Sequence, residues 1–237
     1  MTTFTAFQPV SLNPALIGAA VSALTGHPSL LVHSGTEFEV ATTTAELDIH
    51  GSGFTYPFGP SYGPGTGTIT TLELSFKMGS SYVPAYEFTG LAIPAHQLQL
   101  DVIQGNFSAI FALFVHGHER INGSPFADHL NDYGGFDSIT GGAGNDTMNG
   151  AHGHDKFYFH GGFGNDVIKH FIAGTVANHD TIVLHHDTGW LNFAQVHAGE
   201  TLVGGDVQIM DTSGDTITFA NIHTLTALKA ADFHFIA

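Results

Sequence analysis

Between residues 114 and 169 an apolar side chain recurs at one fixed position of a nine-residue period, in a segment rich in glycine and polar residues. The recurring apolar residues are Ile121, Leu130, Ile139, Met148, Phe157 and Ile168. Two extra residues, Phe159 and His160, interrupt the period before the last unit. Side chains alternate along a strand, so one apolar residue between polar neighbours predicts a short strand that buries a single side chain. The pattern therefore predicts a series of very short strands separated by turns.

An acidic residue stands two positions before each of these apolar residues. The acids are Glu119, Asp128, Asp137, Asp146, Asp155 and Asp166. The central unit, residues 141–149, reads G-G-A-G-N-D-T-M-N, and its neighbours keep parts of the same order. Gly-Asn-Asp runs are common in ordinary turns, but five successive units that keep the Asp in register indicate a repeat rather than isolated turns.

The repeat resembles the calcium-binding nonapeptide of RTX (repeats-in-toxin) proteins. The resemblance implies a mainly β fold in which the nonapeptides form a right-handed parallel β-roll. One lap of the roll takes two repeats, so repeat n stacks on repeat n+2. One edge would then stack Glu119, Asp137 and Asp155, and the other would stack Asp128, Asp146 and Asp166.

Calcium is the cofactor that this resemblance implies, because calcium prefers six to eight oxygen ligands from carboxylates and backbone carbonyls. We expect three to five bound ions. The predicted site residues are Asp128, Gly135, Asp137, Gly142, Gly144, Asp146, Gly153, Asp155, Gly162, Gly164 and Asp166.

The charge balance agrees with a cation as partner. The chain has 21 acidic and 5 basic residues, for a formal net charge of −16. Facing rows of carboxylates oppose a compact state, so calcium binding and folding should be coupled. The same charge argues against nucleic acid as a partner, since no basic stripe is present. No cysteine is available for disulfides or thiol catalysis, and no apolar segment is long enough to predict a membrane span.

Three parts are expected along the chain. Residues 1–113 form an N-terminal β-rich (α+β) module, with short helices near 14–24 and 95–113, the second of which caps the roll. Residues 114–169 form the roll. Residues 170–237 form a C-terminal β cap, with its clearest strands at 180–184, 207–210 and 215–219.

The C-terminal segment also resembles the ends of bacterial RTX proteins, through F-I-A-G, H-D-T-I-V-L, D-T-I-T-F-A-N-I and the closing A-D-F-H-F. In that family this region is recognised by type I secretion machinery. The resemblance implies a partner in that machinery and export from a Gram-negative cell to the extracellular medium. The N-terminal residues lack the charged region of a secretory signal peptide, which is consistent with this route.

The N-terminal module leaves its activity open. The string G-F-T-Y-P-F at 53–58 is similar to secreted hemophores, which implies Tyr56 as a haem ligand. Seventeen histidines leave open a zinc or copper site, although solvent-facing turns also accept histidine. No HExxH, G-x-S-x-G, P-loop or Rossmann motif is present. We therefore expect a non-enzymatic protein that binds a surface, glycan, matrix component or small ligand. The alternatives are a hemophore-like scavenger and a small secreted hydrolase.

Overall fold

The computed structural model describes residues 1–7, 29–34, 37–41, 45–55, 66–78, 80–95, 97, 117–132, 134–174 and 177–237. These residues divide into a first unit that ends by residue 97 and a second unit that runs from Gly117 to Ala237. The predicted boundary between residues 113 and 114 lies outside the described ranges and stays a prediction. No described helix is long and apolar enough to cross a membrane.

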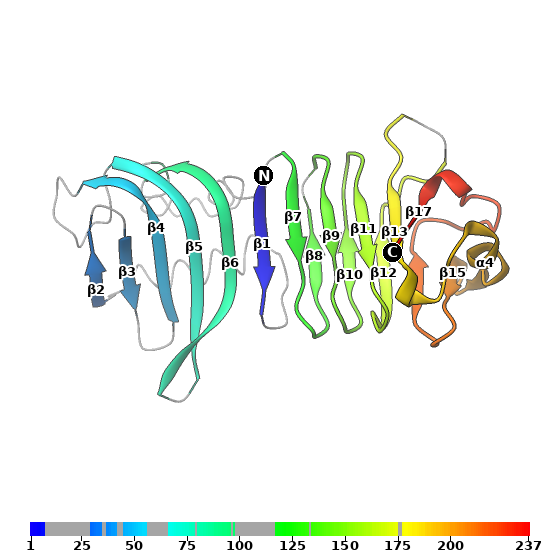
Figure 1. Ribbon diagram of the computed structural model, residues 1–237, viewed down its shortest axis with the longest axis horizontal. Coiled ribbons are helices and arrows are strands. Elements are labelled where there is room, and N and C mark those ends of the chain that lie inside the picture. The colour runs from blue at the N-terminus through cyan, green and yellow to red at the C-terminus, as the bar shows by residue number, and fades with distance from the viewer. Residues whose placement is uncertain are drawn as a thin grey trace. The chain divides into compact units, whose positions relative to one another are not determined.

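The first unit contains an antiparallel sheet (Figure 1). Its strands are β1 (Thr2–Ala6), β2 (Ser29–His33), β3 (Glu37–Ala41), β4 (Ala45–Thr55), β5 (Thr66–Met78) and β6 (Ser81–Pro94). They pair in the order β1-β6-β5-β4-β3-β2. Apolar residues alternate toward one buried face, as Phe4, Leu72 and Phe88 show. The helices predicted near 14–24 and 95–113 fall outside the described residues, apart from positions 95 and 97.

The second unit winds into a parallel β-roll, as the nine-residue period predicts. One sheet contains β7 (Glu119–Asn122), β9 (Ser138–Thr140), β11 (Lys156–Phe159), β13 (Thr181–His185) and β17 (Phe233–Ile236), all parallel and in that order. Figure 1 shows the first four side by side. Arg120 lies opposite Ser138, and Ser138 lies opposite Lys156. The lap is therefore eighteen residues long from β7 to β9 and from β9 to β11, which confirms the predicted stacking of repeat n on repeat n+2.

The opposite sheet of the roll alternates with the first along the chain. It contains β8 (His129–Asn131), β10 (Thr147–Asn149), β12 (Asn165–Lys169) and β16 (Thr216–Phe219) in parallel. The antiparallel strands β15 (Asp206–Met210) and β14 (Thr201–Val203) then continue it. Strands predicted at 180–184, 207–210 and 215–219 correspond to β13, β15 and β16.

In the nonapeptides the core of the roll contains the recurring apolar side chain of each repeat, and β13 and β16 bury further apolar residues. Seven of these side chains are fully buried, at 0% exposure: Ile121, Leu130, Ile139, Met148, Phe157, Ile168 and Ile182. At the end of β11, Phe159 packs edge-on against Phe163, and Phe163 lies near the buried Trp190. The next segment includes a short helix that the strand pattern did not predict, α4 (Phe193–Ala198), which Asn192 caps by accepting a hydrogen bond from the Gln195 backbone NH.

Candidate metal centre

A row of carboxylates runs along one edge of the roll, and we call it the first row. Its members are Glu119, Asp137, Asp155 and Asp180, and each is at most 3% exposed. Successive laps are joined through these side chains. Asp137 Oδ1 accepts a hydrogen bond from the Glu119 backbone NH at 2.6 Å, and Asp155 Oδ1 accepts one from the Asp137 NH at 3.0 Å. Asp180 Oδ1 accepts from the Asp155 NH at 2.9 Å, so the row continues past the nonapeptides.

The second row lies along the other edge and contains Asp128, Asp146 and Asp166. Asp146 Oδ1 accepts from the Asp128 NH at 2.9 Å, and Asp166 Oδ1 accepts from the Asp146 NH at 2.8 Å. At its start, the Ser124 NH donates to Asp128 Oδ2 at 2.6 Å. In both rows one carboxylate oxygen of each Asp that joins two laps therefore accepts a hydrogen bond from the backbone. The second oxygen of Asp180 also has a backbone partner, because it accepts from the Ile172 NH at 2.8 Å.

The second oxygen of four Asp side chains has no hydrogen-bond partner among the described residues. These are the buried Oδ2 atoms of Asp137, Asp146, Asp155 and Asp166. Buried polar atoms are nearly always satisfied in folded proteins, so a set of four in register calls for an explanation. A bound cation is a physical explanation, because it satisfies a carboxylate oxygen that no NH reaches.

At the first edge, backbone carbonyl oxygens lie close to glycines that are themselves next to the carboxylates of the first row. A Cβ at Gly135 would lie 1.6 Å from Gly117 O and 2.9 Å from Asp137 Oδ2. A Cβ at Gly153 would lie 1.8 Å from Gly135 O and 3.2 Å from Asp155 Oδ1. The missing side chains therefore leave room where carboxylate and carbonyl oxygens meet, and this all-oxygen donor set suits calcium.

The glycines of the second edge differ in how much space an added Cβ would have. A Cβ at Gly142 would meet Ser124 O at 2.3 Å, and one at Gly164 would meet Gly144 O at 1.7 Å. A Cβ at Gly144 would meet Phe126 O at 2.7 Å. In contrast, nothing lies within 4 Å of a Cβ at Gly162. Thus Gly162 is the one predicted site glycine at which an added Cβ would meet open space. Which residues bind each calcium ion stays a prediction.

Burial makes these carboxylates reluctant to ionise in the absence of metal. It raises the pKa of Asp137 and Asp146 to about 6, from an ordinary 3.8. The pKa of Asp155 rises to about 7 and that of Asp166 to about 8, again mainly through burial. Burial also raises the pKa of Asp180. A divalent cation would stabilise the ionised form of every member of the rows.

Two acidic residues of this centre were missed in the sequence. Asp180 stands two positions before the buried Ile182, which is the same spacing as in the repeats, but it follows Asp155 by 25 residues rather than 18. Asp132 has a carboxylate oxygen within 4.8 Å of those of Glu119 and Asp137. It occupies the first position of its unit, where the central unit has Gly141.

Without calcium, lowering the pH from about 8 to about 6 is expected to stabilise the folded roll. The pKa values of Asp155 and Asp166 are higher in the folded state than the ordinary 3.8, so the folded form holds protons that the unfolded form has lost. Stability from this source is present below about pH 4 and is lost as the pH rises through about 6 to 8. Circular dichroism of chelated protein at the two pH values checks this. A larger β signal at the higher pH would contradict it.

The sequence of the roll matches a known family of calcium-binding repeats. A sequence model of the RTX calcium-binding nonapeptide repeat matches residues 122–157 in four copies. The chain carries RTX calcium-binding repeats. The matched RTX segment contains β8 to β10 and the first residues of β11, and with them four of the seven row members, Asp128, Asp137, Asp146 and Asp155. The resemblance found in the sequence is thereby confirmed, as are the parallel β-roll and calcium as its cofactor.

No curated protein matches the RTX chain. Among solved structures, it is similar to the extracellular lipase LipA from Serratia marcescens, at 14% sequence identity and a TM-score of 0.36. The match covers 89% of this chain and 31% of the lipase, so the chain spans about a third of that protein's length. Tyr56, the predicted haem ligand, lies outside the described residues.

Proposed function

We propose that this RTX protein is exported unfolded by type I secretion machinery from a Gram-negative cell and folds outside on binding calcium. The observation that carries this proposal is the pair of carboxylate rows. They contain seven buried acidic side chains, four of which have a buried oxygen without a hydrogen-bond partner among the described residues. A charged arrangement of this kind is stable only with its cations, so calcium concentration decides whether the roll folds.

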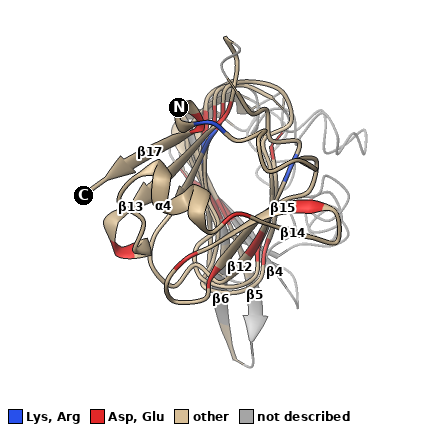
Figure 2. Ribbon diagram, turned by 90° about the vertical axis from the view of Figure 1, so that its right-hand side faces the viewer, with Lys and Arg blue, Asp and Glu red and all other residues tan. Residues whose placement is uncertain are grey.

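The charge of the whole chain supports the same coupling. Acidic segments, red in Figure 2, greatly outnumber the basic ones in blue, in keeping with 21 acidic and 5 basic residues. Sites in extracellular calcium modules commonly have dissociation constants of about 10⁻⁴ to 10⁻³ M, far above cytosolic calcium. In that range the chain would stay unfolded in the cytosol and fold in the medium.

We assign recognition by the export machinery to residues 170–237. These residues supply β13 and β17 to one sheet of the roll and β16, β15 and β14 to the other. The inward-facing apolar residues of β13, β15 and β16 are buried in the folded roll, so these parts of the signal would be accessible only before folding. This property suits a segment that the export machinery must recognise on an unfolded chain.

The specific binding role would belong to the first unit, without enzymatic activity. Across its sheet, Thr5 pairs with Glu87, Glu87 with Glu73, and Glu73 with Asp48. Carboxylates directly opposite one another destabilise a sheet, so stability alone does not account for this line. Carboxylates and hydroxyls together accept and donate hydrogen bonds to hydroxyl-rich molecules, which supports a glycan-like or matrix ligand.

Export is tested by expressing the full chain in a host that carries an RTX-type secretion system, beside a variant that lacks residues 170–237. We expect the full chain in the medium and the truncated chain in the cells. A matched control lacks instead the first-unit residues 1–97 and should still be exported. Equal export of the full and C-terminally truncated chains would overturn the secretion part of the proposal, but not calcium binding.

A further inference from the structure

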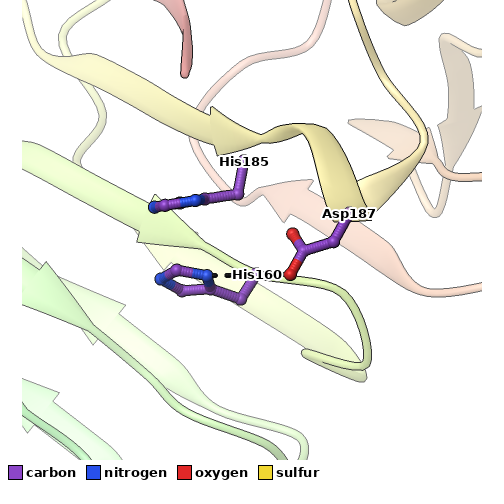
Figure 3. Close-up of side chains that lie close together, drawn as sticks. All are labelled: His160, His185 and Asp187. Atoms are coloured by element: carbon purple, nitrogen blue, oxygen red, sulfur yellow. Dashed lines mark ion pairs between the residues drawn. The ribbon is translucent and has the colours of Figure 1, made fainter. Parts of the chain in front are cut away.

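We propose that His160, His185 and Asp187 form a binding site for a divalent transition-metal ion, with Zn²⁺ as its occupant, separate from the calcium rows. Among the described residues, only two groups of three potential ligands bring their ligand atoms within 4.8 Å of one another. One is the acidic group of Glu119, Asp132 and Asp137 at the calcium centre. The other is this cluster, and it alone contains nitrogen donors (Figure 3).

The roll itself brings the two histidines together. Strands β11 and β13 are parallel, and Phe159 at the end of β11 lies opposite Leu184. His160 and His185 are the next residues along each strand, so their side chains emerge next to each other. Their rings stack with centroids 3.6 Å apart and an angle of 28° between the planes.

Asp187 is positioned by a short helical turn, a 3-10 helix at His186–Thr188. The Thr188 hydroxyl donates to His185 O at 2.7 Å, and Gly189 ends the turn with a φ of 84°. The carboxylate points toward His160, with Asp187 Oδ2 3.8 Å from His160 Nδ1, as Figure 3 shows.

A close backbone approach holds the two sides of the cluster in place. Gly161 directly follows His160, and a Cβ at Gly161 would lie 2.6 Å from Asp187 O. The chain after β11 therefore passes directly against the turn that carries Asp187. His185 and Asp187 come from one side of this contact, and His160 comes from the other. The backbone positions of all three residues are therefore fixed in the absence of metal.

The donor set distinguishes this site from the calcium centre. Imidazole nitrogens suit zinc and neighbouring transition metals, whereas calcium prefers oxygen. Two histidines and one carboxylate also match the three protein ligands of many open zinc sites, in which water fills the remaining position. His160 and Asp187 expose 53% and 60% of their side-chain surface, which leaves room for that water.

Metal binding requires a small inward movement of the side chains. Ligands at about 2.0–2.1 Å from a tetrahedral zinc lie about 3.3 Å from one another, and the ligand atoms here lie within 4.8 Å. Rotation of exposed side chains on a fixed backbone supplies the difference. Coordination would also replace the stacked arrangement of the rings, because each nitrogen must point at the ion within its ring plane.

The test is isothermal titration of the calcium-saturated full chain with Zn²⁺. We expect one tightest site per chain. In His160→Ala and in His185→Ala its affinity should fall at least about tenfold, because the loss of residues that merely support a ligand already costs this much. His223→Ala is the matched control, since His223 is also exposed and pairs with a carboxylate, Asp206, at 3.0 Å.

The outcomes separate a metal site from a stacked histidine pair. Unchanged zinc affinity in both variants, or an equal loss in His223→Ala, would overturn the proposal. Each variant's fold is checked in calcium by the fluorescence of Trp190. Asp187→Asn, which keeps the shape of the side chain, provides a second measurement if an alanine variant does not fold. It should also weaken zinc binding, and an unchanged affinity there counts against the site.

Discussion

Chelation of calcium at neutral pH is expected to unfold the roll almost completely and to expose Trp190. This residue is the only tryptophan in the chain, lies in the second unit and is 3% exposed. Its emission therefore reports the fold of the second unit within the intact protein. We expect a red shift of that emission on chelation, together with a loss of β signal in circular dichroism.

The expected size of this effect follows from the carboxylate rows. A pKa of about 6 for Asp146 instead of 3.8 corresponds to roughly 3 kcal/mol against the folded state at neutral pH. The pKa values of Asp155 and Asp166 lie higher still. Together these costs compare with the whole stability of a domain, about 5–15 kcal/mol. Calcium removes the cost because it binds the ionised carboxylates.

Magnesium provides the control for this experiment. It demands a small octahedral site and gives up its water reluctantly, so equal concentrations should restore little of the fold, whereas calcium should restore all of it. Emission and β signal that stay the same in chelator would show that the rows are stable without metal. In that case calcium would not control folding.

Substitution of Gly164 by alanine is expected to destabilise the calcium-bound roll by about 3 kcal/mol or more. Gly164 has a φ of +94°, which side chains rarely adopt. A Cβ there would also lie 1.7 Å from Gly144 O and 2.8 Å from the carbonyl carbon of the same residue. The backbone of one lap would have to move away from the other. Because Gly144 is itself a predicted site residue, the calcium needed for folding should increase as well.

Gly162→Ala is the matched control, two residues away in the same turn. Its φ of +82° imposes a comparable backbone strain, but nothing lies within 4 Å of the added Cβ. We expect a loss of only about 1–2 kcal/mol. Urea unfolding in saturating calcium, followed through Trp190, measures both variants. Equal losses would mean that the close approach of the two laps contributes nothing beyond the strain of the turn.

The repeats made much of the second unit predictable because their contacts are local and uniform. Each repeat buries its recurring apolar residue, and the backbone NH of each Asp donates to the Asp one lap later, so a constant spacing places these carboxylates in rows. Asp137 and Asp155 were predicted to stack, and the hydrogen bond between them confirms it. Helix α4 was not predicted, since the segment around it has no repeat and a short helix depends on its packing.

The sequence by itself determined the roll, its eighteen-residue lap and the calcium chemistry of its edges, because period and residue type carry all of that information. Only the tertiary structure decided the length of the lap that follows Asp155. There the lap lengthens from 18 to 25 residues, and this single change places Asp180 at the end of the first row and His185 beside His160. The length of a lap that contains an irregular loop depends on how the whole loop packs. A residue pattern reveals spacing only while the spacing stays constant.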